Sequence, residues 1–193
     1  LIFGHEICGE VIERGSGVKK TPLGAKVAVE SHIYCGTCAT CAAGDRHLCR
    51  RMVLVGIDTS GGFAEYVSVP ERVLWKLDSK IPYDYASLME PLGNAIYTTC
   101  VEPVEGKTVL IMGCGPQGLY AIQAAKAAGA SLIVAVEKSH FRAHLAKELG
   151  AHHVIGTEDE SLEKLQEKLL SLKQTKEGFD VCLEMSGSSV LIS

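Results

Sequence analysis

Four cysteines within fifteen residues are the strongest chemical signal in this sequence. They follow the spacing C-x2-C-x2-C-x7-C, at Cys35, Cys38, Cys41 and Cys49. One loop with this spacing can surround a single tetrahedral cation with four thiolates, and four protein ligands leave no open position for a substrate. The pattern therefore predicts a structural zinc site. Two disulfides or an iron–sulfur cluster are the alternatives; the cluster is disfavoured because cluster motifs usually take a cysteine from elsewhere in the chain.

A glycine-rich turn at 113–118 is the second signal. It reads Gly-Cys-Gly-Pro-Gln-Gly, matches G-x-G-x-x-G, follows an apolar run and opens an alanine-rich segment. In such a turn Gly113 permits the tight bend, Gly115 lets the backbone approach a pyrophosphate, and Gly118 allows the helix to pack closely on the strand. The free N–H groups at the helix N-terminus favour phosphates. We predict a dinucleotide site.

An acidic residue, Glu137, stands at the end of the next apolar run, 24 positions after Gly113. A carboxylate at this place accepts hydrogen bonds from the ribose hydroxyls of the adenosine. Its negative charge also repels a 2′-phosphate. The sequence therefore favours NAD over NADP as the cofactor.

Composition and charge narrow the function classes. The 193 residues carry 19 basic and 23 acidic side chains, a net charge of −4, so electrostatics gives no reason to expect a nucleic acid or an anionic membrane as partner. The apolar runs are far too short to span a bilayer. The four other cysteines stand singly in apolar surroundings, which suits a reducing cytoplasm better than a secreted disulfide scaffold. We expect a cytoplasmic protein whose partner is a small-molecule substrate.

The elements that must position these residues change character along the chain. Up to about residue 100, short β-branched segments at 7–13 and 26–30 alternate with turn residues, and a further strand is expected at 63–69. Residues 84–101 have the apolar spacing of a helix, interrupted at Glu90-Pro91. This first part is predicted to be rich in β-structure.

From Gly106 onward, predicted strands alternate with predicted helices. Strands are expected at 108–112, 132–136, around 154–155 and at 179–184, and helices at 119–128, between Ser139 and Gly150, and at about 160–172. The alternation indicates βαβ units and a parallel sheet. A six-stranded doubly wound sheet would need about two more such units. Because an obvious first strand is also missing, we expect an internal fragment of a longer protein.

Three features in this order make the chain resemble the medium-chain, zinc-dependent alcohol dehydrogenase family: Gly4-His5-Glu6, the four-cysteine loop and the nucleotide turn. The resemblance covers essentially the whole chain. It implies an α/β fold, with a partial GroES-like, β-rich catalytic domain at 1–100 that carries a zinc lobe at 35–49. A partial Rossmann domain, a doubly wound parallel sheet that binds NAD, is then expected at 101–193.

Within the family, the likeness is greatest to members that oxidise the secondary alcohol of L-threonine with NAD+ to 2-amino-3-oxobutanoate and NADH. It rests on Ser-His-Ile-Tyr-Cys-Gly at 31–36, Glu-Pro-Leu-Gly-Asn-Ala at 90–95 and Gly-Phe-Asp-Val-Cys-Leu-Glu-Met-Ser-Gly at 178–187. Polyol dehydrogenases share Glu-Pro-Leu but usually lack the Gly-Asn-Ala that follows. A dehydrogenase for a polyol or another secondary alcohol is the alternative, as is an inactive fragment that binds zinc and nucleotide. The resemblance also implies a homotetramer.

The resemblance further implies roles for single residues. His5 and Glu6 correspond to two ligands of a catalytic zinc that keeps an exchangeable position for substrate. Glu90 corresponds to an acid that either joins the zinc shell or relays protons beside it. His32 would approach the substrate, with a structural histidine as the alternative.

In the nucleotide part, Gln117, Glu137 and Arg142 correspond to positions that contact NAD. The third ligand of the catalytic zinc is normally a cysteine well upstream of Gly-His-Glu, and it would precede Leu1. The segments that face the nicotinamide would follow Ser193. We therefore expect this chain to hold the structural zinc and part of the NAD site.

Overall fold

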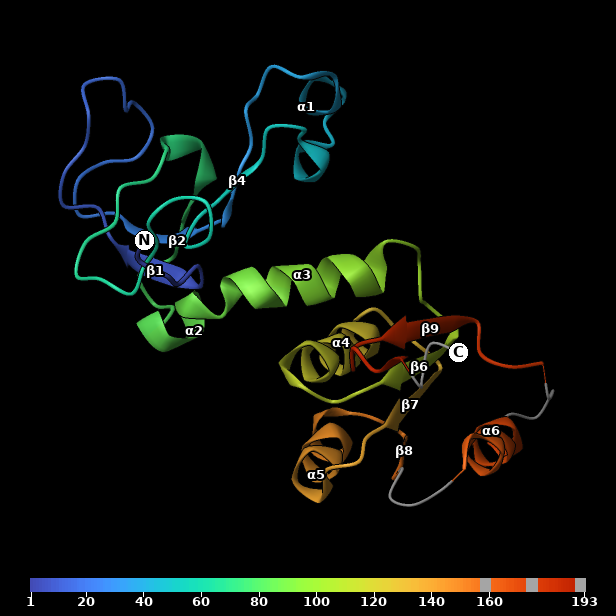
Figure 1. Ribbon diagram of the computed structural model, residues 1–193. Helices are drawn as coiled ribbons and strands as arrows, with labels where there is room; N and C mark the ends of the chain where they lie inside the picture. Colours follow the sequence, from blue (N-terminus) through green and yellow to red (C-terminus); the bar gives the residue numbers. More distant parts are fainter. Residues whose placement is uncertain (157–160, 173–176, 190–193) are drawn as a thin grey trace. The chain divides into compact units, whose positions relative to one another are not determined.

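The computed structural model describes residues 1–156, 161–172 and 177–189 (Figure 1). The chain divides into two compact units, Leu1–Pro91 and Leu92–Ser193. The first contains short strands and the second alternates strands and helices, as the predicted fold class requires. The domain boundary predicted from the sequence, at 100–101, lies at the end of helix α3 (Met89–Cys100). It stays a prediction. None of the helices in the described ranges is long and apolar enough to cross a membrane.

A three-stranded antiparallel sheet forms the centre of the first unit. Its order is β1 (Ile7–Glu10), β2 (Lys26–Val29) and β5 (Leu74–Lys76). Three of the four residues of the central strand are buried, and both of its edges are paired. Ala28 packs against Leu77 and against Ala86 of helix α2 (Tyr83–Ser87). These side chains are small, so this core buries little apolar surface.

A second, two-stranded sheet closes the base of the cysteine loop. Strand β3 (His32–Ile33) pairs with β4 (Val53–Leu54), so the chain leaves and returns at the same place. Between them lie helix α1 (Ala39–Ala43) and the 3-10 helix η1 (Arg46–Leu48) (Figure 1). Gly44 ends α1 with φ +99, a left-handed conformation that suits glycine. A further 3-10 helix, η2 (Glu71–Val73), precedes β5.

Two expectations for this unit were wrong. Residues 63–69 form no strand: backbone hydrogen bonds join 61–63 to residues 2–4 and stop at Phe63, and a strand needs a continuous ladder. The helix predicted at 84–101 is interrupted at Leu88, between α2 and α3, rather than at Glu90-Pro91. Pro91 lies in the first turn of α3, where a backbone N–H would have no partner within the helix, so the proline is tolerated.

The second unit contains a parallel four-stranded sheet in the order β8-β7-β6-β9. Its strands are β6 (Thr108–Met112), β7 (Leu132–Val136), β8 (His153–Ile155) and β9 (Val181–Glu184). In chain order this is 3-2-1-4, the first part of the doubly wound arrangement 3-2-1-4-5-6. All four strands were predicted from their apolar runs. The strand order reverses between β6 and β9, and ligands of such sheets bind at the carboxyl ends of the strands beside this point.

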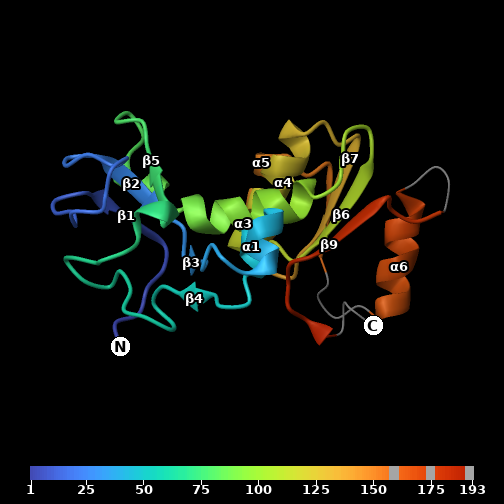
Figure 2. The same ribbon diagram turned by 90° about the horizontal axis from the view of Figure 1, so that it is seen from above.

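Helices cover both faces of this sheet (Figures 1 and 2). On one face, α4 (Pro116–Ala127) and α5 (His140–Leu149) bury alanines and Ile122 against Val109, Ile111 and Ile133. On the other face, Leu165 of α6 (Leu162–Ser171) packs on Leu110, Val134 and Val136. The helix predicted at 160–172 is thus present as α6, and Glu160 lies outside the described residues.

The glycine-rich turn between β6 and α4 depends on two close contacts. Gly113 has φ +94, and a Cβ there would lie 2.7 Å from the Cα of Ser186. A Cβ on Gly118 would lie 1.9 Å from the carbonyl oxygen of Gly113. Apart from its two chain neighbours, no heavy atom of the described residues stands within 4 Å of a Cβ built on Gly115, so this side of its backbone is open. Gly113 and Gly118 thus meet the steric requirements expected of them, whereas the approach of a pyrophosphate to Gly115 stays a prediction.

Gly118→Ala is expected to destabilise the second unit by about 2 kcal/mol or more, since the turn must move away from the helix to admit the methyl group. Gly115→Ala is the matched control: its methyl group meets no side chain or backbone of the described residues beyond its chain neighbours, and losing the N-cap glycine of α4 should cost less than about 1 kcal/mol. Urea unfolding of both variants measures the difference. Equal stability of the two would contradict the packing role of Gly118.

Candidate functional site

The four cysteines of the loop converge on one point. Their sulfur atoms all lie within 4.8 Å of one another. The Sγ–Sγ distances are 3.4 Å for Cys38–Cys41, 3.9 Å for Cys38–Cys49 and 4.0 Å for Cys35–Cys41. Zinc–sulfur bonds of 2.3 Å in a tetrahedron would separate neighbouring sulfurs by about 3.8 Å. The loop therefore fits a single tetrahedral zinc ion.

These distances argue against the two alternatives to a zinc site, a pair of disulfides and an iron–sulfur cluster. All eight cysteines are free thiols, and the shortest separation is far beyond the disulfide bond length of about 2.05 Å. In a multi-iron cluster the thiolates are attached to different iron atoms and stand further apart than ligands of one ion. A mononuclear metal site is the arrangement that the geometry favours.

Hydrogen bonds prepare part of the loop to bind a cation. The backbone N–H of Thr37 donates to the Cys35 sulfur at 3.5 Å and lowers the pKa of this thiol to about 5. The Thr40 hydroxyl lies 3.1 Å from the Cys38 sulfur and lowers its pKa to about 6. Burial instead raises the pKa of Cys41 to about 11, so this thiol must lose its proton when a metal binds.

A second cluster lies in the same unit. Ligand atoms of His5, Glu6 and Glu90 lie within 4.8 Å of one another. His5 and Glu6 directly precede β1, whereas Glu90 comes from the first turn of α3, 84 positions after Glu6. The fold thus brings together the three residues that the family resemblance associates with a catalytic metal. A histidine nitrogen and two carboxylate oxygens are suitable zinc ligands.

His32 belongs to a third group that shares Glu90. Ligand atoms of Glu30, His32 and Glu90 also lie within 4.8 Å of one another. The Nδ1 atom of His32 lies 2.6 Å from Glu30 Oε1 and 3.0 Å from Ser31 Oγ. Ser31, which is buried, donates its hydroxyl to Glu90 Oε1 at 2.8 Å. Sequence reasoning identified His32 and Glu90 but missed Glu30 and the contact through Ser31, which depends on the fold.

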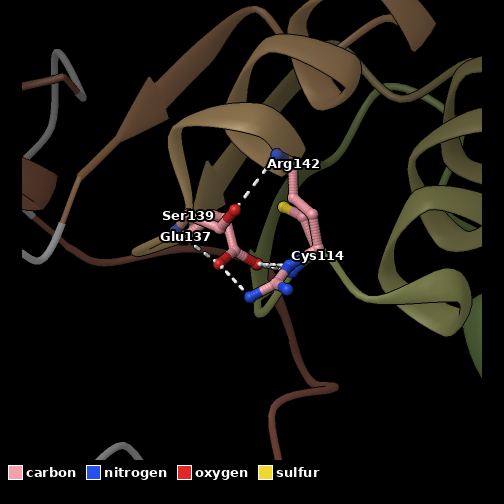
Figure 3. A network of polar contacts seen from close by, with 4 residues as sticks. All are labelled: Cys114, Glu137, Ser139 and Arg142. Atoms are coloured by element: carbon pink, nitrogen blue, oxygen red, sulfur yellow. Dashed lines mark hydrogen bonds and ion pairs between the residues drawn. The ribbon is translucent and has the colours of Figure 1, made fainter.

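Two of the predicted nucleotide residues, Glu137 and Arg142, lie together with Cys114 and Ser139 (Figure 3). The buried Glu137 carboxylate accepts hydrogen bonds from the backbone N–H groups of Cys114 at 2.7 Å and Ser139 at 2.8 Å. Arg142 donates to both carboxylate oxygens, at 3.1 and 2.7 Å. Gln117 lies in the first turn of α4 and is half-buried.

The environment of Glu137 strongly favours its charged form. Burial by itself would raise its pKa, but hydrogen bonds from Arg142, Ser139 and Cys114 outweigh this and lower the pKa to about 2. A hollow of about 410 Å³ opens beside the carboxylate and is lined by Glu137, Lys138, His140, Ala143, Val154, Gly156 and Lys168. The carboxylate therefore stays ionised at the edge of a space that a ligand can enter.

Known proteins resemble both parts of the chain. Residues 1–79 match the family described as alcohol dehydrogenase GroES-like domain, and residues 116–193 match the family described as zinc-binding dehydrogenase. L-Threonine 3-dehydrogenase of Pyrococcus horikoshii is 46% identical over 187 residues, which cover 97% of this chain and 53% of that protein.

Solved structures of dehydrogenases are also similar to this chain. The 2R,3R-butanediol dehydrogenase of Bacillus subtilis is 36% identical, with a TM-score of 0.80 and coverage of 98% of this chain and 52% of that one. An Escherichia coli CFT073 alcohol dehydrogenase complexed with NADH is 32% identical, also with a TM-score of 0.80, and the match covers 86% of this chain and 50% of that one.

A β-rich unit with a four-thiolate loop, followed by a sheet of Rossmann order with a glycine-rich turn, is the architecture of zinc- and dinucleotide-dependent dehydrogenases. The chain belongs to the zinc-dependent alcohol dehydrogenase family, which confirms the predicted resemblance and fold class. It spans about half the length of the curated relatives that it matches.

Cys41→Ser is expected to release the metal from the cysteine loop, because three thiolates and a hydroxyl bind zinc far more weakly than four thiolates. The melting temperature should fall by about 5 °C or more, while the contacts around Glu137 remain. Metal analysis of the purified protein and thermal unfolding measure both effects. Cys100→Ser changes an exposed thiol outside the loop and is the control. Unchanged zinc content in Cys41→Ser would overturn the site.

The Glu137–Arg142 pair should make the second unit sensitive to acid. The folded-state pKa of Glu137 is about 2, below the ordinary glutamate value of about 4.3. Its stabilisation, on the order of 2 kcal/mol, is therefore present above pH of about 4.3 and lost as the pH falls towards 2.

Arg142→Gln removes the ion pair. The free energy of unfolding of this variant should therefore fall well below that of the native chain at neutral pH, and the difference should shrink below pH of about 4. Urea unfolding between neutral and acidic pH measures this difference. Glu167→Gln, which removes an exposed acid of α6, serves as the control. A difference that does not depend on pH would exclude the ion pair as its source.

Proposed function

We propose that this chain is part of an NAD- and zinc-dependent dehydrogenase that oxidises the secondary alcohol of L-threonine to 2-amino-3-oxobutanoate. The observation that carries the proposal is the convergence of His5, Glu6 and Glu90, with His32 beside them, in a chain 46% identical to an L-threonine 3-dehydrogenase. The reaction takes a hydride from the substrate carbon to NAD+ and releases one proton.

His5, Glu6 and Glu90 would hold a catalytic zinc ion, together with a cysteine from the complete protein. A zinc ion bound there acts as a Lewis acid that lowers the pKa of the substrate hydroxyl. His32 is the residue that would accept the hydroxyl proton, because its imidazole adjoins Glu90 and is half-exposed. Cys35, Cys38, Cys41 and Cys49 would hold a second, structural zinc ion.

NAD would bind in the second unit at the turn 113–118. The backbone N–H groups at the start of α4 would receive the pyrophosphate over Gly115, where the space in front of the backbone is open. Gln117 would contact the cofactor from the same turn. Glu137 would accept hydrogen bonds from the adenosine ribose, and Arg142 would contact the adenosine from α5. The ionised carboxylate disfavours a 2′-phosphate, which supports NAD over NADP.

The second candidate function is oxidation of a polyol or another secondary alcohol. Likeness to 2R,3R-butanediol dehydrogenase at 36% identity favours it, since the two chains share the fold of both units. A zinc- and nucleotide-binding fragment without turnover is the third candidate.

The family resemblance further supports a cytoplasmic location and a homotetramer. Light scattering of the full-length protein would test the oligomeric state.

NADH formation by the full-length protein tests the substrate. We expect L-threonine to give a kcat/KM at least about tenfold above those of sorbitol and 2,3-butanediol, measured by NADH absorbance. A higher value for either diol would assign the protein to the second candidate function. Binding of NAD without turnover of any of the three would support the third.

Glu137→Ala is expected to weaken NAD binding by about tenfold, since each lost charged hydrogen bond is worth about 1.5 to 3 kcal/mol, partly offset by water. Binding of NADP should weaken less or improve, because the carboxylate no longer repels the 2′-phosphate. Fluorescence titration with both dinucleotides gives the ratio of the two dissociation constants. A ratio equal to that of the native chain would argue against this role of Glu137.

A further inference from the structure

Glu30 holds His32 at two points. Its Oε1 atom accepts a hydrogen bond from the backbone N–H of His32 at 3.1 Å and lies 2.6 Å from the imidazole Nδ1. Glu30 directly follows β2, and His32 is the first residue of β3. The two contacts fix the backbone and the ring of His32 relative to one carboxylate.

The chemistry of the partners determines which ring nitrogen carries the proton. An ionised carboxylate only accepts hydrogen bonds, so the proton between Glu30 and His32 belongs to Nδ1. In a neutral imidazole the other nitrogen, Nε2, is then the unprotonated one. Glu30 therefore selects the tautomer in which Nε2 is the basic atom.

Ser31 extends this network to Glu90. The Ser31 hydroxyl donates its one proton to Glu90 Oε1, at 2.8 Å. Its oxygen, 3.0 Å from His32 Nδ1, is then free to accept part of the Nδ1–H bond. Three successive residues thus link the imidazole to the carboxylate that belongs to the candidate metal cluster.

A second histidine–glutamate pair in the chain shows what an ordinary surface contact looks like. His144 and Glu148 lie one helical turn apart on α5, at 3.3 Å, with side chains 74% and 58% exposed. Contacts of this kind contribute little. The Glu30–His32 pair is shorter and less exposed, and it is held by an additional backbone hydrogen bond.

We propose that Glu30 is a positioning residue of the catalytic centre: it orients His32 and keeps it as the Nδ1–H tautomer, so that Nε2 is presented to the substrate hydroxyl. The inference deepens the proposed function and rests on the role given there to His32. Carboxylates that orient a histidine in this way are a recurring device of active sites, and replacing them typically reduces activity 10- to 100-fold.

Nuclear magnetic resonance of the chain labelled with 15N in its histidines tests the tautomer directly. Correlations between ring protons and nitrogens distinguish Nδ1–H from Nε2–H, at a pH well above the ordinary histidine pKa of about 6.5. The signal of His32 is assigned by its loss in His32→Asn. The native chain and Glu30→Gln, whose amide oxygen can still accept the bond, should show Nδ1–H.

Glu30→Ala should move His32 towards Nε2–H, whereas Glu148→Gln, the matched control on the surface pair, should leave it unchanged. An Nε2–H tautomer in the native chain, or an unchanged Nδ1–H tautomer in Glu30→Ala, would overturn the proposal. Circular dichroism establishes whether the variants are folded. If Glu30→Ala does not fold, the nearly isosteric Glu30→Gln still allows the tautomer of His32 to be compared with that of the native chain.

Kinetics of the full-length protein with L-threonine complete the test. Glu30→Ala should lower kcat 10- to 100-fold with little change in KM, and Glu30→Gln should recover most of the loss. A changed tautomer with an unchanged kcat would overturn the positioning role in the reaction. Absence of turnover in the native protein would instead refute the proposed function, and the tautomer spectra would still decide whether Glu30 orients His32.

Discussion

The second unit, Leu92–Ser193, depends on one buried negative charge. The Glu137 carboxylate cannot be left without partners in the interior, and it obtains them from three places: the turn after β6, the residue that caps α5, and Arg142 one turn further on. Satisfying this charge fixes the glycine-rich turn relative to α5. The same contacts keep the carboxylate ionised at the mouth of the hollow beside it. The group that fixes the turn is thus the same one to which we assign recognition of the adenosine ribose.

The metal-binding unit is organised differently. Its apolar core is small, and its polar groups are held by short connections between segments far apart in sequence. The contact of Ser31 with Glu90 spans 59 positions, and the cluster of His5, Glu6 and Glu90 joins the first residues of the chain to the start of α3. The candidate metal ligands and the hydrogen-bonded carboxylates here connect segments that the small core does not join.

The sequence was sufficient where local signals coincide with tertiary structure. The strands of the parallel sheet are mostly apolar because helices cover both faces, and Gly113 and Gly118 stand where backbone contacts exclude a side chain. It was insufficient where the outcome depends on a neighbour. Residues 63–69 alternate like a strand but have no ladder, and Pro91 was judged without knowing that a helix begins two residues before it.

The candidate site shows the same limit. Spacing alone identified the four cysteines, since a short loop brings all its ligands together. The family resemblance suggested Glu90 and His32, but no periodicity or spacing places Glu30 against the imidazole or Ser31 against Glu90. Such contacts arise from the way β2 ends and α3 begins, and they become visible only when the chain is folded.

The ionisation of the cysteine loop has a consequence for the lifetime of the protein. With a pKa of about 5 for Cys35 and about 6 for Cys38, both sulfurs are mainly thiolates at neutral pH. A bound cation would shield these sulfurs from oxidants, whereas a loop that has lost its metal presents reactive thiolates 3.4 to 4.0 Å from other sulfurs. Oxygen would then take two electrons from a pair of these thiolates and join them in a disulfide, which prevents rebinding of the metal until a reductant restores the thiols.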